Sequence, residues 1–445
     1  MISPAQQRDW LQQLVAAQNG AAHHSANNSA NNPEWTLDRS ATLKEILMTL
    51  PVINRSLEAW RYTSIDALFQ QTFKSVHAVP KVAADHPLLQ PVVDSYRMVL
   101  VNGHYVAGLS QQQLPAGVSF SGLSTALKNN PDGLIDHAEH VFTALNSALH
   151  RDGVLLHVAA GVVLDKPLEI IYLNQSADQA LLIQPRNVIK LDAGAKATLV
   201  ERFISSDQSV YFNNQLTDIV LADDASLEHY RLQDESRHAW HLSSLYLSLQ
   251  ARSFYRATSL ALGGRWARTD YITEFQQAGA ECELNGLYTV GDQQLIDFHL
   301  DTRHQVPNCT SRSHFKGLLY GKGRAVFDGR IYVAKDAQRS DAKLSNDNLL
   351  LTRDAEVDTK PQLEIYADDV QCSHGTTVGQ LDAQQIFYMR SRGIDAAAAR
   401  DILCLGFANT VLDTIQLPAL HQYASQKLNE TLHAPVVRNG VGDGR

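Results

Sequence analysis

Cys372 and His374, near the end of the chain, carry side chains that could bind a metal ion or a sulfur species. They lie in residues 356–379, which have the pattern of a strand, a turn at Asp368 and Asp369, and a second strand. In an extended strand, residues two positions apart leave the same face, roughly 6.5–7 Å from each other. A thiol and an imidazole at this spacing could therefore reach one small centre or one partner surface.

A structural role for this pair is the simpler interpretation. Free cysteine is among the most buried residue types, and a histidine in a turn can have its hydrogen bonds satisfied locally. The preceding strand fits such a packed setting, since Leu363, Ile365 and Ala367 alternate with polar residues. Spacing alone favours a small buried hydrophobe beside a satisfied histidine, so a role in chemistry needs a further observation.

A second set of candidate ligands, His299, His304, Cys309 and His314, recurs at even intervals of five residues. This interval suits neither one helix face nor one strand face, and it does not match zinc-finger spacing. Histidines that form hydrogen bonds on turns are the alternative to a metal site here, and the sequence does not decide their roles. The four cysteines include no CxxC pair, which argues against a disulfide framework or a thiolate zinc site.

Nucleotide, nucleic-acid and membrane binding find little support in the sequence. GLLYGKGR (residues 317–324) is the nearest match to a phosphate-binding loop, but it lacks the Ser or Thr after Gly-Lys and precedes a strand pattern. We therefore expect no ATP site in this chain.

The net charge of −9 and the lack of a Lys/Arg run argue against nucleic-acid binding. Without a run of ~20 apolar residues or a signal-peptide pattern, we expect no membrane segment and a cytoplasmic location.

The patterns divide the chain into three regions, of which the middle one is the core. Residues 1–150 are predicted to be mainly helical, with a flexible linker at about 20–33 and a hairpin at 97–106. Residues 151–380 show short alternating strands, and a motif of turn residue, Ala and alternating apolar residues recurs at about 30 residues. We interpret this core as a solenoid of strands, a β-helix, with a β-sandwich as the alternative.

Residues 381–445 are predicted to form a C-terminal helical domain. Asp382 and Asp395 can cap two helices, and Pro418 can open a third that ends near Leu432. The second of these helices has an apolar face made by Ile402, Leu403, Phe407, Val411 and Leu412. Apolar helices after a solenoid either cap its open end or provide a docking face, and the pattern favours capping, although the two roles are compatible.

Four segments resemble the SufB/SufD family of iron–sulfur cluster assembly proteins. They are EAWRYTSIDALF (58–69), CTSR (309–312), KGRAVFDGRIYVAKDAQRSDAKLSNDNLLLTRDAEVDTKPQLEIYADDVQCSHGTTVG (322–379) and QIFYMRSRGI (385–394). The SufD branch fits best. The resemblance covers most of the chain and weakens at residues 20–33 and in the last dozen residues.

The resemblance implies a right-handed parallel β-helix flanked by N-terminal and C-terminal helical regions. It implies pairing with SufB through the last strands of the two β-helices, while each subunit's C-terminal helices bind one copy of the SufC ATPase, giving one SufB, two SufC and one SufD. Sulfur would come from a cysteine desulfurase and its sulfur-transfer partner, and the nascent Fe–S cluster would form at the SufB–SufD interface. The family is also linked to iron entry, to reduced flavin (FAD), and to oxidative stress and iron starvation.

Carried over to this chain, the resemblance matches His374 to the histidine implicated in cluster formation and Cys372 to its neighbouring cysteine. Either could hold iron or the cluster transiently, since imidazole and thiolate are suitable ligands. Gly375 stands where SufB-type sequences carry an acidic residue, which points to a supporting, non-enzymatic scaffold subunit. The residues expected to dock the ATPase are Ile386, Phe387, Arg392, Ile394, Ile402 and Phe407. An unpaired last strand would also let a homodimer form when SufB is absent.

Two other functional classes stay open on the sequence alone. A β-helix enzyme acting on carbohydrate would need several carboxylates aligned on one face of the solenoid, and spacing reveals no such cluster. In a purely structural solenoid, Cys372 and His374 would be core residues, and replacing His374 with Ala would leave cluster assembly intact.

Overall fold

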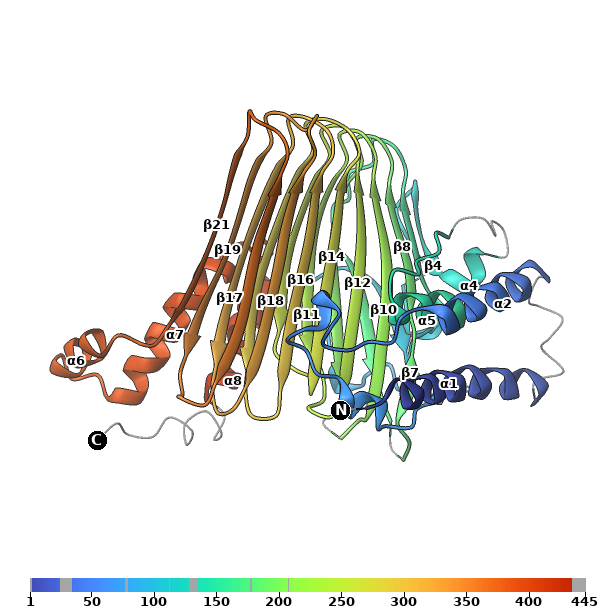
Figure 1. Cartoon of the computed structure of the whole chain (residues 1–445), viewed down its shortest axis with the longest axis horizontal. Helices are drawn as coiled ribbons and strands as arrows, with labels where there is room; N and C mark the ends of the chain where they lie inside the picture. The colour runs from blue at the N-terminus through green and yellow to red at the C-terminus, as the bar shows by residue number, and fades with distance from the viewer. Residues whose placement is uncertain are drawn as a thin grey trace.

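The computed structural model describes residues 2–24, 34–76, 79–111, 113–127, 134–176, 178–206 and 208–433. It shows a parallel β-helix with helices at its N-terminal and C-terminal ends (Figure 1). From β8 onward each strand pairs in parallel with the strand two positions further along the chain, and not with its immediate successor. The predicted solenoid is therefore confirmed, and the β-sandwich alternative is wrong.

Two sheets, A and B, form the opposite faces of the solenoid. Sheet A consists, from the C-terminal end, of β20 (Glu356–Ile365), β18 (Arg324–Val333), β16 (Leu295–His304), β14 (Trp266–Phe275), β12 (Trp240–Leu249), β10 (Tyr211–Leu221), β8 (Arg186–Leu191), β5 (Gly153–Val158) and β4 (Val118–Gly122), with β7 (Leu181–Ile183) joining β10 to β1 (Lys74–Ser75). Sheet B consists of β21 (Gln371–Gly379), β19 (Asp341–Leu350), β17 (Thr310–Leu319), β15 (Glu281–Val290), β13 (Phe254–Ala261), β11 (Ser226–Asp234), β9 (Lys196–Ser205), β6 (Leu168–Asn174), β2 (Tyr96–Val101) and β3 (His104–Tyr105).

The length of one coil varies slightly around the predicted repeat. Trp240 pairs with Trp266, 26 residues later, whereas Arg324 pairs with Glu356, 32 residues later. At Ala195, Ala225 and Ala280 the Ala of the recurring motif is buried at a turn, and the residue before it adopts a left-handed conformation, with φ of 58° at Asp224. This turn conformation explains why Gly or a short polar residue recurs there in the sequence.

Alternate side chains of the strands fill the interior of the solenoid. Phe298, Phe315 and Phe327 stack there at ring distances of 5.0 and 5.2 Å. Each is at most 1 % exposed, and the same core continues through the coils on both sides. The period of two that predicted these strands therefore separates an inward row, which is apolar in these coils, from an outward row.

The N-terminal region covers one part of the outward face of sheet A. Its helices are α1 (Pro4–His24), α2 (Glu34–Thr49), η2 (Glu58–Trp60), α3 (Asp66–Phe69), η3 (Pro87–Leu89), η4 (Ala107–Leu109), α4 (Leu123–Ala126) and α5 (Val141–Leu149). Apolar residues of α1 and α5 pack against Phe212 and Trp240 of sheet A. The predicted hairpin is confirmed, with Asn102 and Gly103 at φ of 49° and 80° between β2 and β3.

Two expectations for the N-terminal region need adjustment. α1 continues to His24, so the first five residues of the predicted linker are helical, and the rest of that linker lies outside the described residues. The expected boundary near residue 150 separates helices from coils only in part, since β2 and β4 precede it and belong to sheets B and A.

The C-terminal helices are α6 (Ala383–Ser391), α7 (Ala396–Leu412) and α8 (Pro418–His433). The side chains of Asp382 and Asp395 accept backbone hydrogen bonds at the starts of α6 and α7, as predicted. α7 and α8 pack on the outward face of sheet B, in a cluster that includes Leu260, Leu287 and Leu318. The expectation that these helices cap the solenoid is wrong, because the apolar patch that attracts them lies on the side of the coils.

No helix within the described residues is long and apolar enough to cross a membrane.

Candidate functional site at the open end of the solenoid

Among the described residues, no strand covers the last coil of the solenoid. β20 pairs with β18 and β21 pairs with β19, and no strand of the described residues pairs with their other edges. We call this the open end, formed by β20 and β21. It presents two edges of unpaired backbone N–H and C=O groups, each of which is a template for another strand.

Cys372 and His374 lie side by side in the inward row of β21. Cys372 pairs in register with Ala342 and His374 with Leu344, and both partners are buried in the core at 0 % and 3 % exposure. Because β21 is the last strand of its sheet, no further coil stacks on its inward row, and that row is accessible at the open end. Cys372 is half-buried and packs on the core, while His374 is exposed. The predicted shared face is confirmed. The interpretation of His374 as a buried histidine with satisfied hydrogen bonds does not fit, because its side chain is exposed.

The environment of Cys372 holds its thiol in the protonated form at neutral pH. Burial raises the pKa of the Cys372 thiol, a backbone hydrogen bond from Ala342 acts in the opposite direction, and the nearby Asp341 carboxylate raises the pKa further. A metal ion that binds this sulfur must therefore displace a proton. The sulfur is better suited to bind metal after a partner changes its surroundings than to react as a free thiolate.

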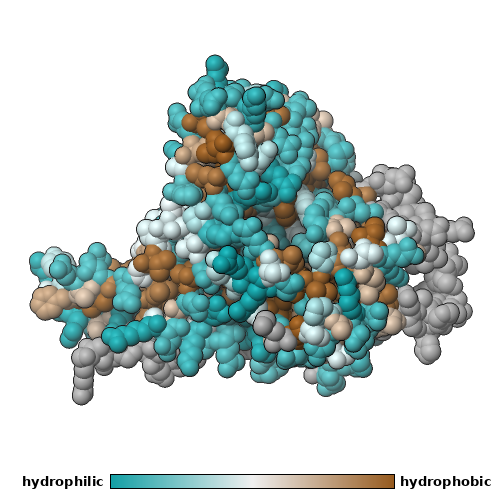
Figure 2. Space-filling view, viewed as in Figure 1, coloured by the Kyte–Doolittle hydropathy of each residue, from teal (hydrophilic) through white to brown (hydrophobic). Residues whose placement is uncertain are grey.

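Apolar side chains accompany this pair at the open end. Ile365, Tyr366 and Val378 are 38 %, 61 % and 50 % exposed, and Leu363 packs on the core beside them. Figure 2 shows apolar residues over the last coil and over the C-terminal helices. Exposed apolar groups beside unpaired strand edges are typical of a protein interface.

The second set of candidate ligands does not form one site. His304 of sheet A is buried and forms a hydrogen bond with Ser311, with 2.9 Å between Nε2 and Oγ. His314 lies on sheet B, 3.6 Å from Asp347 of the same sheet. His299 lies on the outward face of sheet A, and Cys309 is buried at a turn. Among the described residues, no three His, Cys, Asp or Glu side chains are grouped to hold a metal ion. Hydrogen bonding fits these histidines best.

The residues expected to dock the ATPase differ in their exposure. α6 has no buried residue, and Phe387 is 73 % exposed beside Tyr388 at 60 %. Ile402 is 46 % exposed, so it does not share the buried face of α7 that includes Val411 and Leu412. Ile386, Ile394 and Phe407 are half-buried and Arg392 is exposed, with its guanidinium 5.3 Å from the Tyr388 ring. Phe407 contacts Lys316 of β17 through its ring and its carbonyl oxygen, so it also anchors α7.

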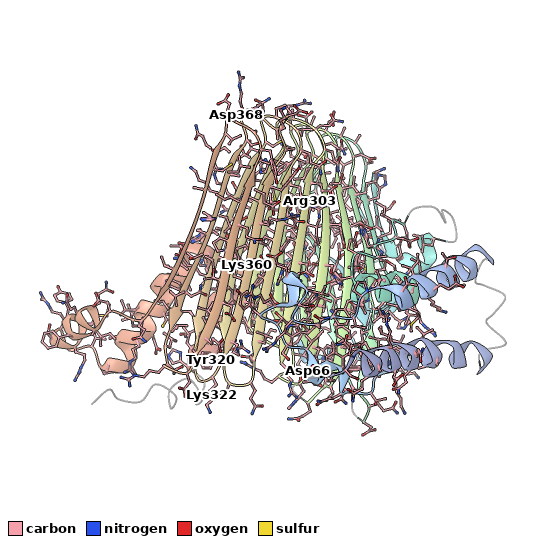
Figure 3. The ribbon with its side chains drawn as sticks, viewed as in Figure 1. Asp66, Arg303, Tyr320, Lys322, Lys360 and Asp368 are labelled. Atoms are coloured by element: carbon pink, nitrogen blue, oxygen red, sulfur yellow. The ribbon has the colours of Figure 1, made fainter. Side chains whose placement is uncertain are left out.

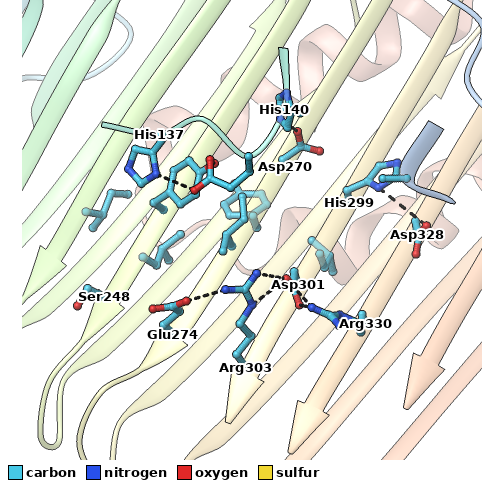
Figure 4. A pocket seen from close by; sticks show the side chains of 18 of the residues that line it. His137, His140, Ser248, Asp270, Glu274, His299, Asp301, Arg303, Asp328 and Arg330 are labelled. Carbon is cyan, nitrogen blue, oxygen red and sulfur yellow. Dashed lines mark hydrogen bonds and ion pairs between the residues drawn. The ribbon is translucent and has the colours of Figure 1, made fainter. Parts of the chain in front are cut away.

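Sequence reasoning missed a groove of about 640 Å³ on the outward face of sheet A, which crosses strands β10 to β20 (Figure 4). One row of its floor reads Asp270, His299, Asp328 and Lys360 on four successive strands. Sequence reasoning did not find these aligned carboxylates because they lie two coils apart, and only the pairing of the strands brings them into one row. A weak signal was present in the segment EAWRYT, whose Glu58 borders this groove.

Two sequence matches agree with this architecture. Residues 172–407 match the SufBD core domain of the SUF system for FeS cluster assembly, and residues 37–170 match the SufBD protein N-terminal region. The chain belongs to the SufBD family. It therefore has a role in iron–sulfur cluster assembly by the SUF system, in which the cluster is the cargo.

Relatives of this SufBD chain match it over most of their length. The iron–sulfur cluster assembly protein SufD of Escherichia coli K12 is 33% identical over 396 residues, 88% of this chain and 91% of the relative. A SufBD family protein of Synechocystis is 28% identical over 84% of this chain and 86% of its own length. The chloroplastic protein ABCI7 of Arabidopsis thaliana is 27% identical over 83% and 80% of the two chains.

Proposed function

We propose that this SufBD chain is a SufD-type, non-catalytic scaffold subunit that pairs with SufB through its open end. In this proposal Cys372 and His374 contribute to a composite site where the nascent Fe–S cluster forms. The observation that carries the proposal is the coincidence of three features at one end of the solenoid. Both unpaired strand edges, the exposed apolar residues and the thiol–imidazole pair all lie on the last coil.

Pairing at the open end would satisfy the backbone of the last coil. β20 has ten residues and β21 has nine, so each edge offers roughly 30 Å of strand to a partner. A second β-helix placed there would continue both sheets and bury Leu363, Ile365 and Val378. Cys372 and His374 would then lie between two solenoids, away from bulk water. When SufB is absent, a second copy of this chain could use the same edges.

The chemistry of the pair requires a second subunit. One thiolate and one imidazole supply two ligands, fewer than the four cysteine ligands common for Fe–S clusters. The remaining ligands, including sulfide sulfur delivered from the desulfurase, would come from the SufB side. Binding of iron to Cys372 releases the thiol proton, and imidazole binds iron in its neutral form.

The C-terminal helices provide the docking surface for SufC in this proposal. Phe387 and Tyr388 on α6 and Ile402 on α7 are large, exposed and apolar, and α6 lies beyond the last coil, away from the body of the solenoid (Figure 1). Because aromatic side chains dominate protein interfaces, this surface is the best candidate for the ATPase contact within the described residues.

The test is co-expression of His374→Ala with SufB and SufC, followed by anaerobic purification, visible absorption and iron analysis. We expect an intact complex with little cluster. Thr376→Ala is the matched control, since Thr376 is exposed in the same inward row and offers no metal ligand. Full cluster content in the intact His374→Ala complex would overturn the role of this histidine. Loss of the complex would instead assign His374 to the interface.

A further inference from the structure

The groove on the outward face of sheet A has the size of a small-molecule site. Its volume of about 640 Å³ falls in the usual range for such sites. The floor comes from outward side chains of the strands, and the segments containing Glu58 and His140 form part of its rim. This groove lies on the side of the coils, so an inference about its ligand does not depend on the proposed function of the open end.

The guanidinium groups of Arg303 and Arg330 in the groove are already engaged. All three nitrogens of Arg303 contact the carboxylates of Asp301 or Glu274, at distances of 2.7 to 2.8 Å. The nitrogens of Arg330 contact Asp301 and Glu364 in the same way, at 2.9 to 3.5 Å. An anionic ligand would have to break these ion pairs before it could bind.

Acceptors, in contrast, are in excess. Eight carboxylate side chains line the groove, against four from Arg or Lys. Protonation of the three histidines among the lining residues would still leave an excess of negative charge. The free binding capacity of the groove is therefore for a cation that donates hydrogen bonds.

Asp270 marks the strongest point for such a cation. It is 5 % exposed, and its Oδ1 accepts a hydrogen bond from Arg268 at 2.7 Å. Its Oδ2 is buried and accepts no hydrogen bond from any described residue. On the rim, Nε2 of His140 lies 3.9 Å from this oxygen, which is too far for a hydrogen bond. Figure 4 shows Asp270 and His140 facing each other at one side of the groove, with Arg303 on the other side.

His140 does not neutralise this carboxylate. Its Nδ1 accepts hydrogen bonds from the backbone N–H groups of Phe142 and Thr143, so the ring carries its proton on Nε2. Burial lowers the pKa of His140 to about 4, and the ring is therefore neutral at pH 7. A buried carboxylate oxygen without a donor is costly, and a cationic N–H group would remove that cost.

The floor between the two charged sides is partly apolar. Ile272 and Tyr246 lie there, and the Tyr246 ring stacks on His137 with centroids 3.6 Å apart. Such a surface can pack against methylene groups. We propose that the groove binds a linear alkylammonium ligand, a free polyamine, with one ammonium group on Asp270 and others on the carboxylates of the opposite side.

The experiment is isothermal titration calorimetry of the full chain with spermidine as the probe. We expect saturable binding that weakens with salt and falls roughly tenfold or more in Asp270→Asn. Glu274→Gln tests the opposite side and should weaken binding several-fold. Asp224→Asn is the control, since it removes the same charge from an exposed turn where Asp224 pairs with Arg252. Circular dichroism establishes whether each variant is folded. If Asp270→Asn does not fold, the binding of spermidine to Glu274→Gln decides the test.

Three results would overturn the proposal. No saturable binding up to about 1 mM spermidine would exclude a specific site. Equal weakening in Asp224→Asn and in the groove variants would show a general charge effect. If a short lysine-containing peptide binds at least tenfold more tightly than spermidine, the ligand of the groove is a lysine side chain of another protein and not a free polyamine.

Discussion

Glu58 contacts Lys360 across 302 positions of the chain, with 3.0 Å between Oε1 and Nζ. Gln362 donates to the same oxygen at 3.3 Å, so one N-terminal carboxylate holds two residues of β20. Figure 3 shows Lys360 partway along the strands, between Tyr320 near one end and Asp368 at the other. The N-terminal segment thus reaches the coil that forms the open end.

Replacing Glu58 should loosen the last coil without unfolding the solenoid. In Glu58→Gln we expect faster amide hydrogen exchange in β20, because Lys360 loses one of its two carboxylate partners and keeps Asp328. The change in unfolding free energy should stay below about 1 kcal/mol, since the Glu58 side chain is 71% exposed. Glu281→Gln on β15, also exposed, is the control. Unchanged exchange in β20 would show that the contact does not hold the coil.

The exposed position of His374 makes a prediction about stability. His374→Ala should change the free energy of unfolding in urea by less than about 0.5 kcal/mol, because no core packing is lost. Leu344 is the buried residue that pairs with His374, and Leu344→Ala should lower the free energy of unfolding by about 2–5 kcal/mol. A loss of ~1–3 kcal/mol in His374→Ala would instead favour a structural role.

Cys372 should be the cysteine that alkylating reagents reach in the folded protein, but it should react slowly at neutral pH. Cys282, Cys309 and Cys404 are buried, whereas Cys372 is half-buried. Burial raises the pKa of the Cys372 thiol, so at a given pH a smaller fraction of it is the reactive thiolate than for a free cysteine. Iodoacetamide labelling read by mass spectrometry should rise with pH, and it should vanish in native Cys372→Ser. Labelling as fast as a free thiol at pH 7 would contradict this.

In the assembled complex, Cys372→Ser should reduce cluster content less than His374→Ala does. The thiol must lose a proton and move out of partial burial before it binds metal, whereas the imidazole of His374 is already exposed. Iron and acid-labile sulfide per complex measure the difference. A larger loss in Cys372→Ser would make the thiolate the principal ligand on this side.

Removal of the aromatic groups on α6 should separate ATPase docking from folding. Phe387→Ala together with Tyr388→Ala should abolish co-purification of SufC and leave the thermal midpoint nearly unchanged, because both side chains are mostly exposed. Leu428→Ala, in the buried face of α8, is the opposite control, which should lower stability. Retained SufC in the aromatic double variant would place the docking surface elsewhere.

His137 should make the stability of the protein depend on pH. Burial lowers the pKa of His137, but its hydrogen bonds to Asp218 and Glu139 outweigh this, and the net pKa is raised above 6.5. A histidine with a raised pKa in the folded state stabilises the fold below about 6.5, and this contribution is lost as the pH rises through the folded value.

We therefore expect a lower thermal midpoint at about pH 8 than at about pH 6, and a flatter profile in His137→Gln. His238→Gln, at an exposed position, is the control. An unchanged profile in His137→Gln would show that other groups set the pH dependence.

The local features of the fold could be predicted from sequence because local chemistry determines them. Asp382 and Asp395 cap helices, Asn102 and Gly103 form the hairpin turn, and the repeat gives the coils. Cys372 and His374 also share a face as their spacing predicts.

Features that depend on contacts between coils could not be predicted in this way. The position of α7 and α8 depends on Leu260, Leu287 and Leu318, which come from three coils and meet only in the folded solenoid. The same holds for the groove, where Asp270 and Asp328 lie in one row because both pair with His299 on the strand between them.

The open end also has a consequence for the fate of the isolated subunit. In a stack of coils each coil is held mainly by its neighbours, and the last one has a neighbour on one side. Its opening should therefore need less free energy than opening of the middle coils, and proteases should cut there first. Binding of a partner to β20 and β21 would supply the missing neighbour and protect the chain. We expect cells to clear unpartnered copies, so that the abundance of this subunit follows that of its partner.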